Sequence, residues 1–465
     1  YKTFSPIFPG SLEFYHVISP VIYYILGLMV FFALVYVITR KKSLALIASV
    51  FLAFNPAYLY RTMAGFADHE SIGMVAFFLA LLIYSFALYY IDHKKSKTYK
   101  TVLWGLGVGF GTALTVASWA GVAKFLFIII PLSLFLVYLF NIKRKDKSFI
   151  LKIIPFYVLW IISTALFGGL LGQGVKKSLS LFTQSQAIIS LAVLGFILID
   201  TFLVHFSFKQ VREQFRIIYS LAITGILGLL ALPILGKNPF TLVGSIINSL
   251  IAPFRGAAGG TRLGATVAEN AQPFLNTWKS QMTPTIFWLF FIGLILFGFI
   301  LARKIKNLKH SIYFGAAYLF MICGIIFSKY SATSLFNGDN FISQAFYLIS
   351  LGTFWIYFFY LYVHKEFSWS GQDTLLFALM FFTIISGRAA ARVFFLITPF
   401  VCLFAAYLLV ELFELIRENK DMALKISLGI VLLLALIPAI SGTYHNYESL
   451  DNSAQYTSPS AHAQW

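Results

Sequence analysis

The sequence predicts an all-α polytopic membrane protein, and three observations carry this prediction. Apolar residues make up 59% of the 465 residues, charged residues make up only 11%, and the mean hydropathy is +0.83. Soluble globular chains have about 45–50% apolar and about 25% charged residues, so this chain has too few charges to cover a water-exposed surface. The apolar residues also form long runs separated by short basic clusters, which is the pattern of membrane-spanning helices and their loops.

Fourteen apolar segments are long enough to be candidate spans. Most have about 17–23 residues, the length that a helix needs to cross about 30 Å of hydrocarbon. The segment from Thr374 is the weakest, because its apolar run is broken early by Gly387 and Arg388. We therefore expect about 12–14 spanning helices. The segments begin near Pro20, Leu44, Ile72, Thr101, Val122, Phe149, Ala187, Ile217, Thr285, Ile312, Ala345, Thr374, Val393 and Ala423.

The basic residues of the loops predict the orientation. Of the 35 Lys and Arg residues, 23 lie in alternate loops beginning with Arg40-Lys41-Lys42, and the other 12 lie on the opposite side. The positive-inside rule makes the richer set cytoplasmic. Both chain ends and the loop that contains Asp68 are then external. The net charge of +18 is explained by these loops, and we expect no nucleic-acid partner.

The predicted domain organisation is one multispanning domain over residues 1–441 with a long external loop at 237–283. The chain opens on Tyr1 and ends in a polar tail, so we expect a fragment at both ends. Long loops in compact proteins are usually functional or disordered. Here the long loop contains a single acid, Glu269.

Two carboxylates lie close together in the stretch "YLYRTMAGFADHESIGM". Asp68 and Glu70 flank His69 in a predicted external loop. Alternate residues of an extended backbone point to one side, and two carboxylates there suit a hard divalent cation. The alternative for Asp68 and Glu70 is a solvated loop that binds no ligand. The alternative for Glu269 is an exposed loop glutamate without a functional role. His69 is not expected to be a ligand.

Two arginines lie at the predicted external boundary in "GRAAARVFFLITP". Arg388 and Arg392 are four residues apart, so in a continuous helix they share one face. They are either snorkelling side chains or a phosphate site, because the planar guanidinium suits phosphoryl oxygens. A third polar position, Asp200 in "GFILIDTFLVHF", lies within an apolar segment, and we expect a structural hydrogen bond there.

Three of these segments, in this order and topology, resemble the catalytic subunit of oligosaccharyltransferase of the archaeal and eukaryotic type, the enzyme of protein N-glycosylation. "NPAYLYRTMAGFADHESIGM" resembles the second acidic motif of that family, a D-x-E/D/H on the second external loop. "TVAE", which ends at Glu269, resembles its T-x-x-E motif. "AARVFFLITP" resembles the segment in which an arginine, here Arg392, precedes a Thr-Pro. The resemblance covers essentially the whole chain.

The resemblance implies a transmembrane domain of the GT-C glycosyltransferase type that transfers an oligosaccharide to asparagine. It assigns Asp68 and Glu70 to Mn²⁺ or Mg²⁺, Glu269 to the metal or the acceptor amide, and Arg392, with Arg388 as the second candidate, to the lipid pyrophosphate. The partners are a lipid-linked (dolichyl) oligosaccharide, a polypeptide with an Asn-x-Ser/Thr sequon, and membrane lipid. The implied location is an archaeal cell membrane with an external active site, or the lumenal face of the endoplasmic reticulum in a eukaryote.

One spacing departs from the family pattern, and two family motifs are expected outside this chain. Glu269 and Arg392 are 123 positions apart, which suggests two additional spans. The first external loop's acidic motif is expected before Tyr1. The WWDYG motif, which in the family recognises the sequon, is expected after Trp465. The resemblance implies that this motif lies in a C-terminal soluble domain that is absent from this chain, and that residues 442–465 begin the linker to it.

Two other functions remain open at this point. A protein O-mannosyltransferase has a similar architecture, but it typically carries its acids on the first external loop and lacks a T-x-x-E loop. A transporter or lipid flippase should place ionisable groups near the membrane midplane and show two repeat halves. The position of Glu269 argues against the first, and the acids gathered at one side argue against the second.

Overall fold

The computed structural model describes residues 11–92, 97–141, 147–184, 187–205, 215–234, 238–241, 244, 271–364 and 366–454. Over these residues every named element is a helix and there is no β-strand, which confirms the predicted all-α class. The named elements are α1 (Leu12–Thr39), α2 (Lys42–Ala53), α3 (Pro56–Leu59), α4 (His69–Asp92), α5 (Thr98–Asn141), α6 (Lys147–Gly168), η2 (Gly169–Gln173), α7 (Val175–Ser180), η3 (Leu181–Thr183), α8 (Ile188–His205), α9 (Arg216–Ile234), α12 (Leu275–Met282), α13 (Pro284–Arg303), α14 (Leu308–Phe327), α15 (Phe341–Val363), α16 (Gly371–Ala389), η6 (Ala391–Val393), α17 (Phe394–Glu418) and α18 (Met422–Ala454).

Among the described residues, ten helices are long and apolar enough to cross a membrane, and the bent pair α7–η3 and α8 would make an eleventh span. All fourteen predicted segments lie on helices, but four do not count as separate spans. The α2 helix has only 12 residues, and α16 is not apolar enough to qualify. The α8 helix counts only as part of the bent pair. The segments that begin near Thr101 and Val122 are joined within α5, so they count as one span.

The α5 helix explains how two predicted spans merge into one element. Its 44 residues would extend about 66 Å as a straight helix, which is twice the thickness of the hydrocarbon core. The backbone leaves helical geometry at Trp119 (φ −151°, ψ 90°), between the predicted starts at Thr101 and Val122. We therefore read α5 as two spanning arms that meet at this kink.

Glycines let the first arm of α5 pack closely against its neighbours. A Cβ added at Gly105 would lie 2.7 Å from the carbonyl oxygen of Phe156 in α6, and one added at Gly111 would lie 2.8 Å from Cα of Ala80 in α4. Helices in a membrane associate mainly through such close packing, because lipid tails are as apolar as leucine. The glycine-rich sequence "GLGVGFG" therefore fixes the contacts of α5 with α4 and α6.

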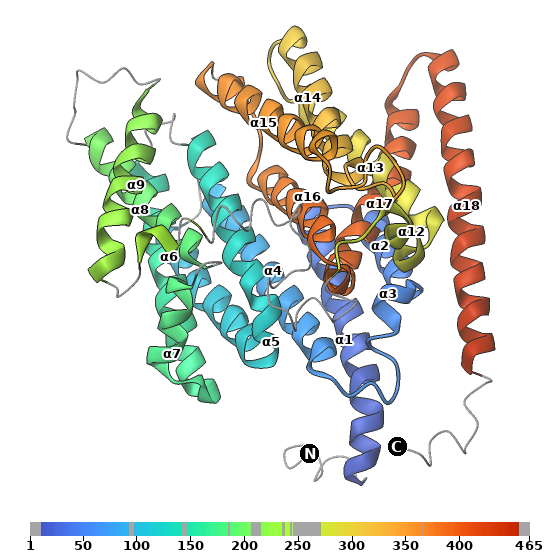
Figure 1. Cartoon of the computed structure of the whole chain (residues 1–465), viewed down its shortest axis with the longest axis horizontal. Helices are drawn as coiled ribbons and strands as arrows, with labels where there is room; N and C mark the ends of the chain where they lie inside the picture. The colour runs from blue at the N-terminus through green and yellow to red at the C-terminus, as the bar shows by residue number, and fades with distance from the viewer. Residues whose placement is uncertain are drawn as a thin grey trace.

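The α17 helix lies between α16 and α18, and α18 lies at the edge of the structure (Figure 1). In the most apolar window of each span, 94% of the residues are buried for the η6–α17 span, compared with 17% for α9 and 6% for α18. The apolar sides of α9 and α18 are therefore left for lipid. A close approach of α13 to α17 depends on Gly293, where a Cβ would lie 2.0 Å from the carbonyl oxygen of Phe404.

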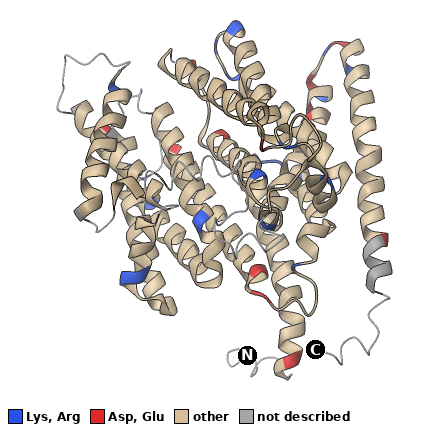
Figure 2. Cartoon of the chain, viewed as in Figure 1, with Lys and Arg blue, Asp and Glu red and all other residues tan. Residues whose placement is uncertain are grey.

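Ion pairs join helix ends at one face of the bundle, which we call the Lys41 face. The Lys41 Nζ lies 2.6 Å from Oε1 of Glu411 and also pairs with Glu414, and the Lys304 Nζ lies 2.6 Å from Oδ1 of Asp373. These contacts bring the ends of α1, α13 and α17 together with the start of α16. Figure 2 shows that most charges of the described residues lie near helix ends and connecting segments.

The opposite face, which we call the Asp68 face, contains the start of α1, the start of α4 and the end of α16. Figure 1 shows the start of α1 and the end of α18 at the same end of the molecule, in agreement with the predicted pairing of the two ends. The α18 helix continues past residue 441 to Ala454, so the described beginning of the predicted linker is helical. These features support a multi-pass integral membrane protein.

Asp200 is fully buried in α8 and has the structural role that was expected. Its Oδ2 accepts a hydrogen bond of 2.8 Å from the Tyr138 hydroxyl, and its Oδ1 accepts bonds from Arg216 Nε at 3.1 Å and Ser220 Oγ at 2.6 Å. Because buried charges are stable only when paired and hydrogen-bonded, this network joins α5, α8 and α9.

Candidate active site at the Asp68 face

The loop that carries the acidic motif is fixed by its own polar residues. Asn55 caps α3 by accepting from the Ala57 N–H at 3.1 Å, and its Nδ2 donates to the carbonyl of Met282 at 3.2 Å. Asn is a favoured N-cap residue, because its side-chain oxygen satisfies a free amide of the first turn. Gly65 then turns the chain with φ +85°, a conformation that favours glycine. These contacts place the loop beside α1 and α12 before α4 begins.

Asp68 and Glu70 occupy different environments at the start of α4. Asp68 precedes the helix, its side chain is 43% exposed, and its Oδ1 accepts from the His69 N–H at 2.7 Å and pairs with His69 Nδ1. Glu70 lies in the first turn, its side chain is only 13% exposed, and both of its oxygens lie 3.0 Å from Arg61 Nη1. The helix begins between the two acids, so the extended-backbone reason for their common direction does not apply. Both carboxylates instead lie at a helix N-terminus, which favours negative charge.

Trp119 is a residue of this site that the sequence reasoning missed. Its ring centroid lies 5.6 Å from that of His69 and 6.1 Å from that of Phe395 in α17. It also contacts α4 one turn after His69, where a Cβ added at Gly73 would lie 2.6 Å from Trp119 Cβ. Trp119 therefore connects the acidic loop to the segment that follows Arg392. Its position in "ASWAG", between two predicted spans, could have indicated a residue at the external boundary.

The two arginines do not share a helical face, so that expectation was wrong. The α16 helix ends at Ala389, Ala390 is extended (φ −159°, ψ 144°), and Arg392 lies in the short η6 turn. Arg392 is exposed, whereas Arg388 is 0% exposed. The helix breaks at Ala390, so Arg388 belongs to the last turn of α16 and Arg392 to the separate η6 turn. A spacing of four residues therefore does not place the two side chains on one face.

Arg388 is held inside the protein by polar partners. Its Nε donates to Ser328 Oγ at 3.4 Å, and its Nη1 donates to Gln272 Oε1 at 3.4 Å. The same Gln272 oxygen accepts from Lys329 Nζ at 3.2 Å. Burial lowers the pKa of the Lys329 ammonium, nearby Asp339 raises it in part, and Arg388 lowers it further. The buried Arg388 guanidinium therefore binds protein groups through Nε and Nη1, while its Nη2 has no hydrogen-bond partner among the described residues.

The last part of the long loop packs onto η6 and α17. The Ala391 N–H donates to the carbonyl of Ala271 at 3.0 Å. In α12, the fully buried Trp278 has its ring centroid 5.2 Å from that of Phe394. Glu269 lies outside the described residues. The described end of the loop is nevertheless attached directly beside Arg392.

The carboxylates are suited to a metal, but they do not form a complete set of ligands. Mg²⁺ and Mn²⁺ prefer carboxylate and other oxygen donors, which Asp68 and Glu70 supply. Within the described residues, no group of three His, Cys, Asp or Glu could hold a metal ion. Arg61 also neutralises Glu70 in the arrangement seen here. Any metal would therefore need at least one ligand from elsewhere.

Several solved structures of one archaeal enzyme are similar to this chain. The oligosaccharyltransferase AglB of Archaeoglobus fulgidus, in complex with an inhibitory peptide and a dolichol-phosphate, matches with a TM-score of 0.56 at 16% identity, over 97% of this chain and 46% of that one. Its apo form matches with a TM-score of 0.56 at 15% identity, over 96% and 46%. The enzyme tethered to an acceptor peptide with the NVT sequon gives 0.52 at 14% identity, over 94% and 44%. At these identities the likeness shows the fold alone.

The chain spans less than half of the length of these solved proteins. No curated protein sequence matches it. Residues 11–255, slightly more than half of the chain, match the family described as oligosaccharyl transferase STT3, N-terminal. The chain therefore belongs to the STT3 oligosaccharyl transferase family.

Proposed function

We propose that this protein is the membrane domain of an oligosaccharyltransferase catalytic subunit. The reaction transfers an oligosaccharide from a polyprenyl (dolichyl) phosphate or pyrophosphate to the side-chain nitrogen of asparagine in an Asn-x-Ser/Thr sequon. One observation carries the proposal: in a chain of the STT3 family, Trp119 brings the acidic motif at Asp68 and the segment after Arg392 together at one face. The AglB complexes with a dolichol-phosphate and with an NVT peptide support the donor and acceptor classes.

The chemistry explains why the site needs both acids and an arginine. The nitrogen of a carboxamide is a poor nucleophile because its lone pair is delocalised into the carbonyl, and the departing pyrophosphate is highly charged. We assign Asp68 and Glu70 to a divalent cation, Mn²⁺ or Mg²⁺, which would stabilise the leaving group as a Lewis acid. Arg392, exposed in η6, would bind the phosphoryl oxygens with its planar guanidinium.

Glu269 completes the proposed set, either at the metal or at the acceptor amide. Ala271 supports this assignment, because its carbonyl is hydrogen-bonded to Ala391 next to Arg392. Arg388, the second pyrophosphate candidate, is left out of the proposed site because Gln272 and Ser328 already bind its buried guanidinium.

The proposed location follows from the charge asymmetry. The loops of the Lys41 face carry most of the basic residues, so we assign that face to the cytoplasm. The Asp68 face is then external in an archaeal cell membrane, or lumenal in the endoplasmic reticulum of a eukaryote. A donor on a polyprenyl lipid also requires a site at the membrane surface, and α4 and η6 supply one at the ends of two spans.

The test uses the full-length gene product, native lipid-linked oligosaccharide and a fluorescent Asn-x-Thr peptide. We expect a glycopeptide mass shift that requires Mn²⁺ or Mg²⁺ and disappears with EDTA. Asp68→Asn and Glu70→Gln should each lower the rate on the order of 100-fold or more. Glu13→Gln, which changes another acid of the same face, is the matched control and should transfer normally.

Three outcomes would contradict the proposal. Unchanged transfer in both Asp68→Asn and Glu70→Gln would remove the metal assignment. Modification of Ser or Thr instead of Asn would identify a protein O-mannosyltransferase. Binding of the sugar lipid without any turnover would favour a transporter.

A further inference from the structure

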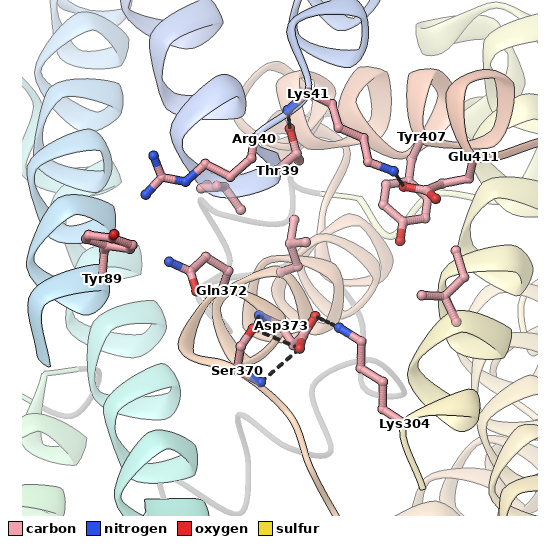
Figure 3. Close-up of a pocket in the computed structure, with 13 residues that line it drawn as sticks. Thr39, Arg40, Lys41, Tyr89, Lys304, Ser370, Gln372, Asp373, Tyr407 and Glu411 are labelled. Atoms are coloured by element: carbon pink, nitrogen blue, oxygen red, sulfur yellow. Dashed lines mark hydrogen bonds and ion pairs between the residues drawn. The ribbon is translucent and has the colours of Figure 1, made fainter. Parts of the chain in front are cut away.

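A pocket of about 430 Å³ opens at the Lys41 face, far from the proposed active site. The ends of α1, α4, α13, α16 and α17 surround it, and its polar lining includes Arg40, Lys41, Lys304, Gln372, Asp373 and Glu411. Figure 3 shows these side chains around the pocket, with Tyr89 on one side and Tyr407 on the other. Ile38, Ile300 and Leu376 supply apolar wall. None of the residues proposed for the transfer reaction lines this pocket.

The charges of the lining are paired, except for one. Lys41 is neutralised by Glu411 and Glu414, and Lys304 is neutralised by Asp373, which also closes a capping box with Ser370. Arg40 forms no ion pair with any residue that the structure describes. An added anion would therefore meet one available guanidinium, while both lysines are already bound to carboxylates.

The backbone and a neighbouring ring fix the Arg40 guanidinium at the pocket. Arg40 ends α1 with φ +60°, a left-handed conformation that is uncommon for residues other than glycine. Its Cζ lies 4.7 Å from the centroid of the Tyr89 ring. An arginine stacked on an aromatic face keeps the N–H groups at its edge available, and these suit the oxygens of a phosphate.

We propose that this pocket binds a phosphate group, with Arg40 as the main ligand and the Gln372 amide as a second donor. Figure 3 shows the Gln372 side chain extending toward the same side of the pocket as Arg40 and Tyr89. The pocket lies where five helices end at the membrane boundary, so the phosphate can belong to a lipid headgroup or to a soluble phosphate. Binding here is independent of the transfer reaction.

The experiment compares two phosphate sources on purified protein stripped of lipid in neutral detergent. In one arm, native mass spectrometry counts bound phosphatidylglycerol, with diacylglycerol as the phosphate-free control. In the other arm, the Tm is measured in inorganic phosphate and in chloride at equal ionic strength. The main variant is Arg40→Gly, because glycine suits the left-handed backbone and so should leave the fold intact. Lys42→Gln is the matched control, because it removes a charge two residues away that does not line the pocket.

We expect Arg40→Gly to weaken phosphate binding about tenfold and Gln372→Ala to weaken it about threefold, while Lys42→Gln has no effect. Arginine-dependent retention of phosphatidylglycerol identifies a lipid ligand. An arginine-dependent rise of the Tm in inorganic phosphate identifies a soluble one. Equal phosphate binding by Arg40→Gly and wild type in both arms would overturn the proposal. A loss of binding in Lys42→Gln as large as that in Arg40→Gly would also overturn it, because it would show general attraction to a basic surface.

Discussion

Arg388 donates a hydrogen bond from Nη1 to Oε1 of Gln272 at 3.4 Å, although the two residues are 116 positions apart. The bond joins the end of α16 to the segment that follows the long loop, and Lys329 binds the same oxygen from the connection between α14 and α15. A buried amide oxygen shared by two cations holds three segments at one point. Arg388 therefore stabilises the surroundings of the site, while the exposed Arg392 can reach a ligand.

The two arginines should respond differently to the same substitution. We expect Arg388→Met to lower the free energy of unfolding by about 2–4 kcal/mol, because Gln272 and Ser328 lose a buried charged donor. Arg392→Met, at an exposed position, should change it by less than about 0.5 kcal/mol but slow transfer on the order of 100-fold. Thermal unfolding and initial rates of the two variants in detergent provide the measurement. If Arg388→Met has a normal Tm but no transfer activity, Arg388 acts in the reaction and is again a candidate for the pyrophosphate site.

The arginines also show what sequence spacing can and cannot predict. A spacing of four residues predicts a common face only if the helix continues, and the extended Ala390 breaks it. Alternating loop charges predicted a common side for the loops next to Lys41 and Lys304, and both residues line the same pocket at the Lys41 face. Asp200 was interpreted correctly, since a buried acid must find partners. Trp119 was missed because its partner Phe395 comes from a distant segment, and such a contact leaves no periodic signal.

Removing Arg61 should strengthen metal binding at the acidic motif. Arg61 Nη1 lies 3.0 Å from both oxygens of Glu70, so it competes with any cation for that carboxylate. We expect Arg61→Gln to lower the dissociation constant for Mn²⁺ about tenfold, measured by electron paramagnetic resonance of the free ion. Lys176→Gln, which removes a charge from α7, should leave the constant unchanged. An unchanged dissociation constant in Arg61→Gln would show that Glu70 is not a ligand. A larger dissociation constant would show that Arg61 holds Glu70 in position for the metal.

The contact between Gly73 and Trp119 predicts a loss of activity from a single methyl group. A Cβ at position 73 would lie 2.6 Å from Trp119 Cβ, so Trp119 must move away from His69 and Phe395. We expect Gly73→Ala to slow transfer on the order of 10- to 100-fold and to lower the free energy of unfolding by about 1–3 kcal/mol. Rates and Tm should be compared with Gly315→Ala in α14, where the added Cβ meets open space. If Gly73→Ala transfers as fast as Gly315→Ala, the position of Trp119 has no influence on the reaction.

The Lys41 ion pairs predict a stability change at alkaline pH. Burial alone would lower the pKa of Lys41, but the hydrogen bonds and charges of Glu411 and Glu414 outweigh burial and raise the pKa above its ordinary value. A raised pKa means that the folded state holds the proton more tightly than the unfolded state. The stabilisation is therefore fully present below about pH 10.5 and is lost as the pH rises through the raised pKa.

Lys41→Met should lower the free energy of unfolding by about 1–2 kcal/mol at neutral pH, because two partly buried carboxylates lose their cation. The difference from wild type should shrink above about pH 10.5, where wild-type Lys41 also loses its proton. Tm measured from pH 7 to 11.5 would follow this convergence, with Lys42→Met as the exposed control. A difference that stays constant to the highest pH would mean that Lys41 stabilises the fold through the packing of its aliphatic chain rather than through its charge.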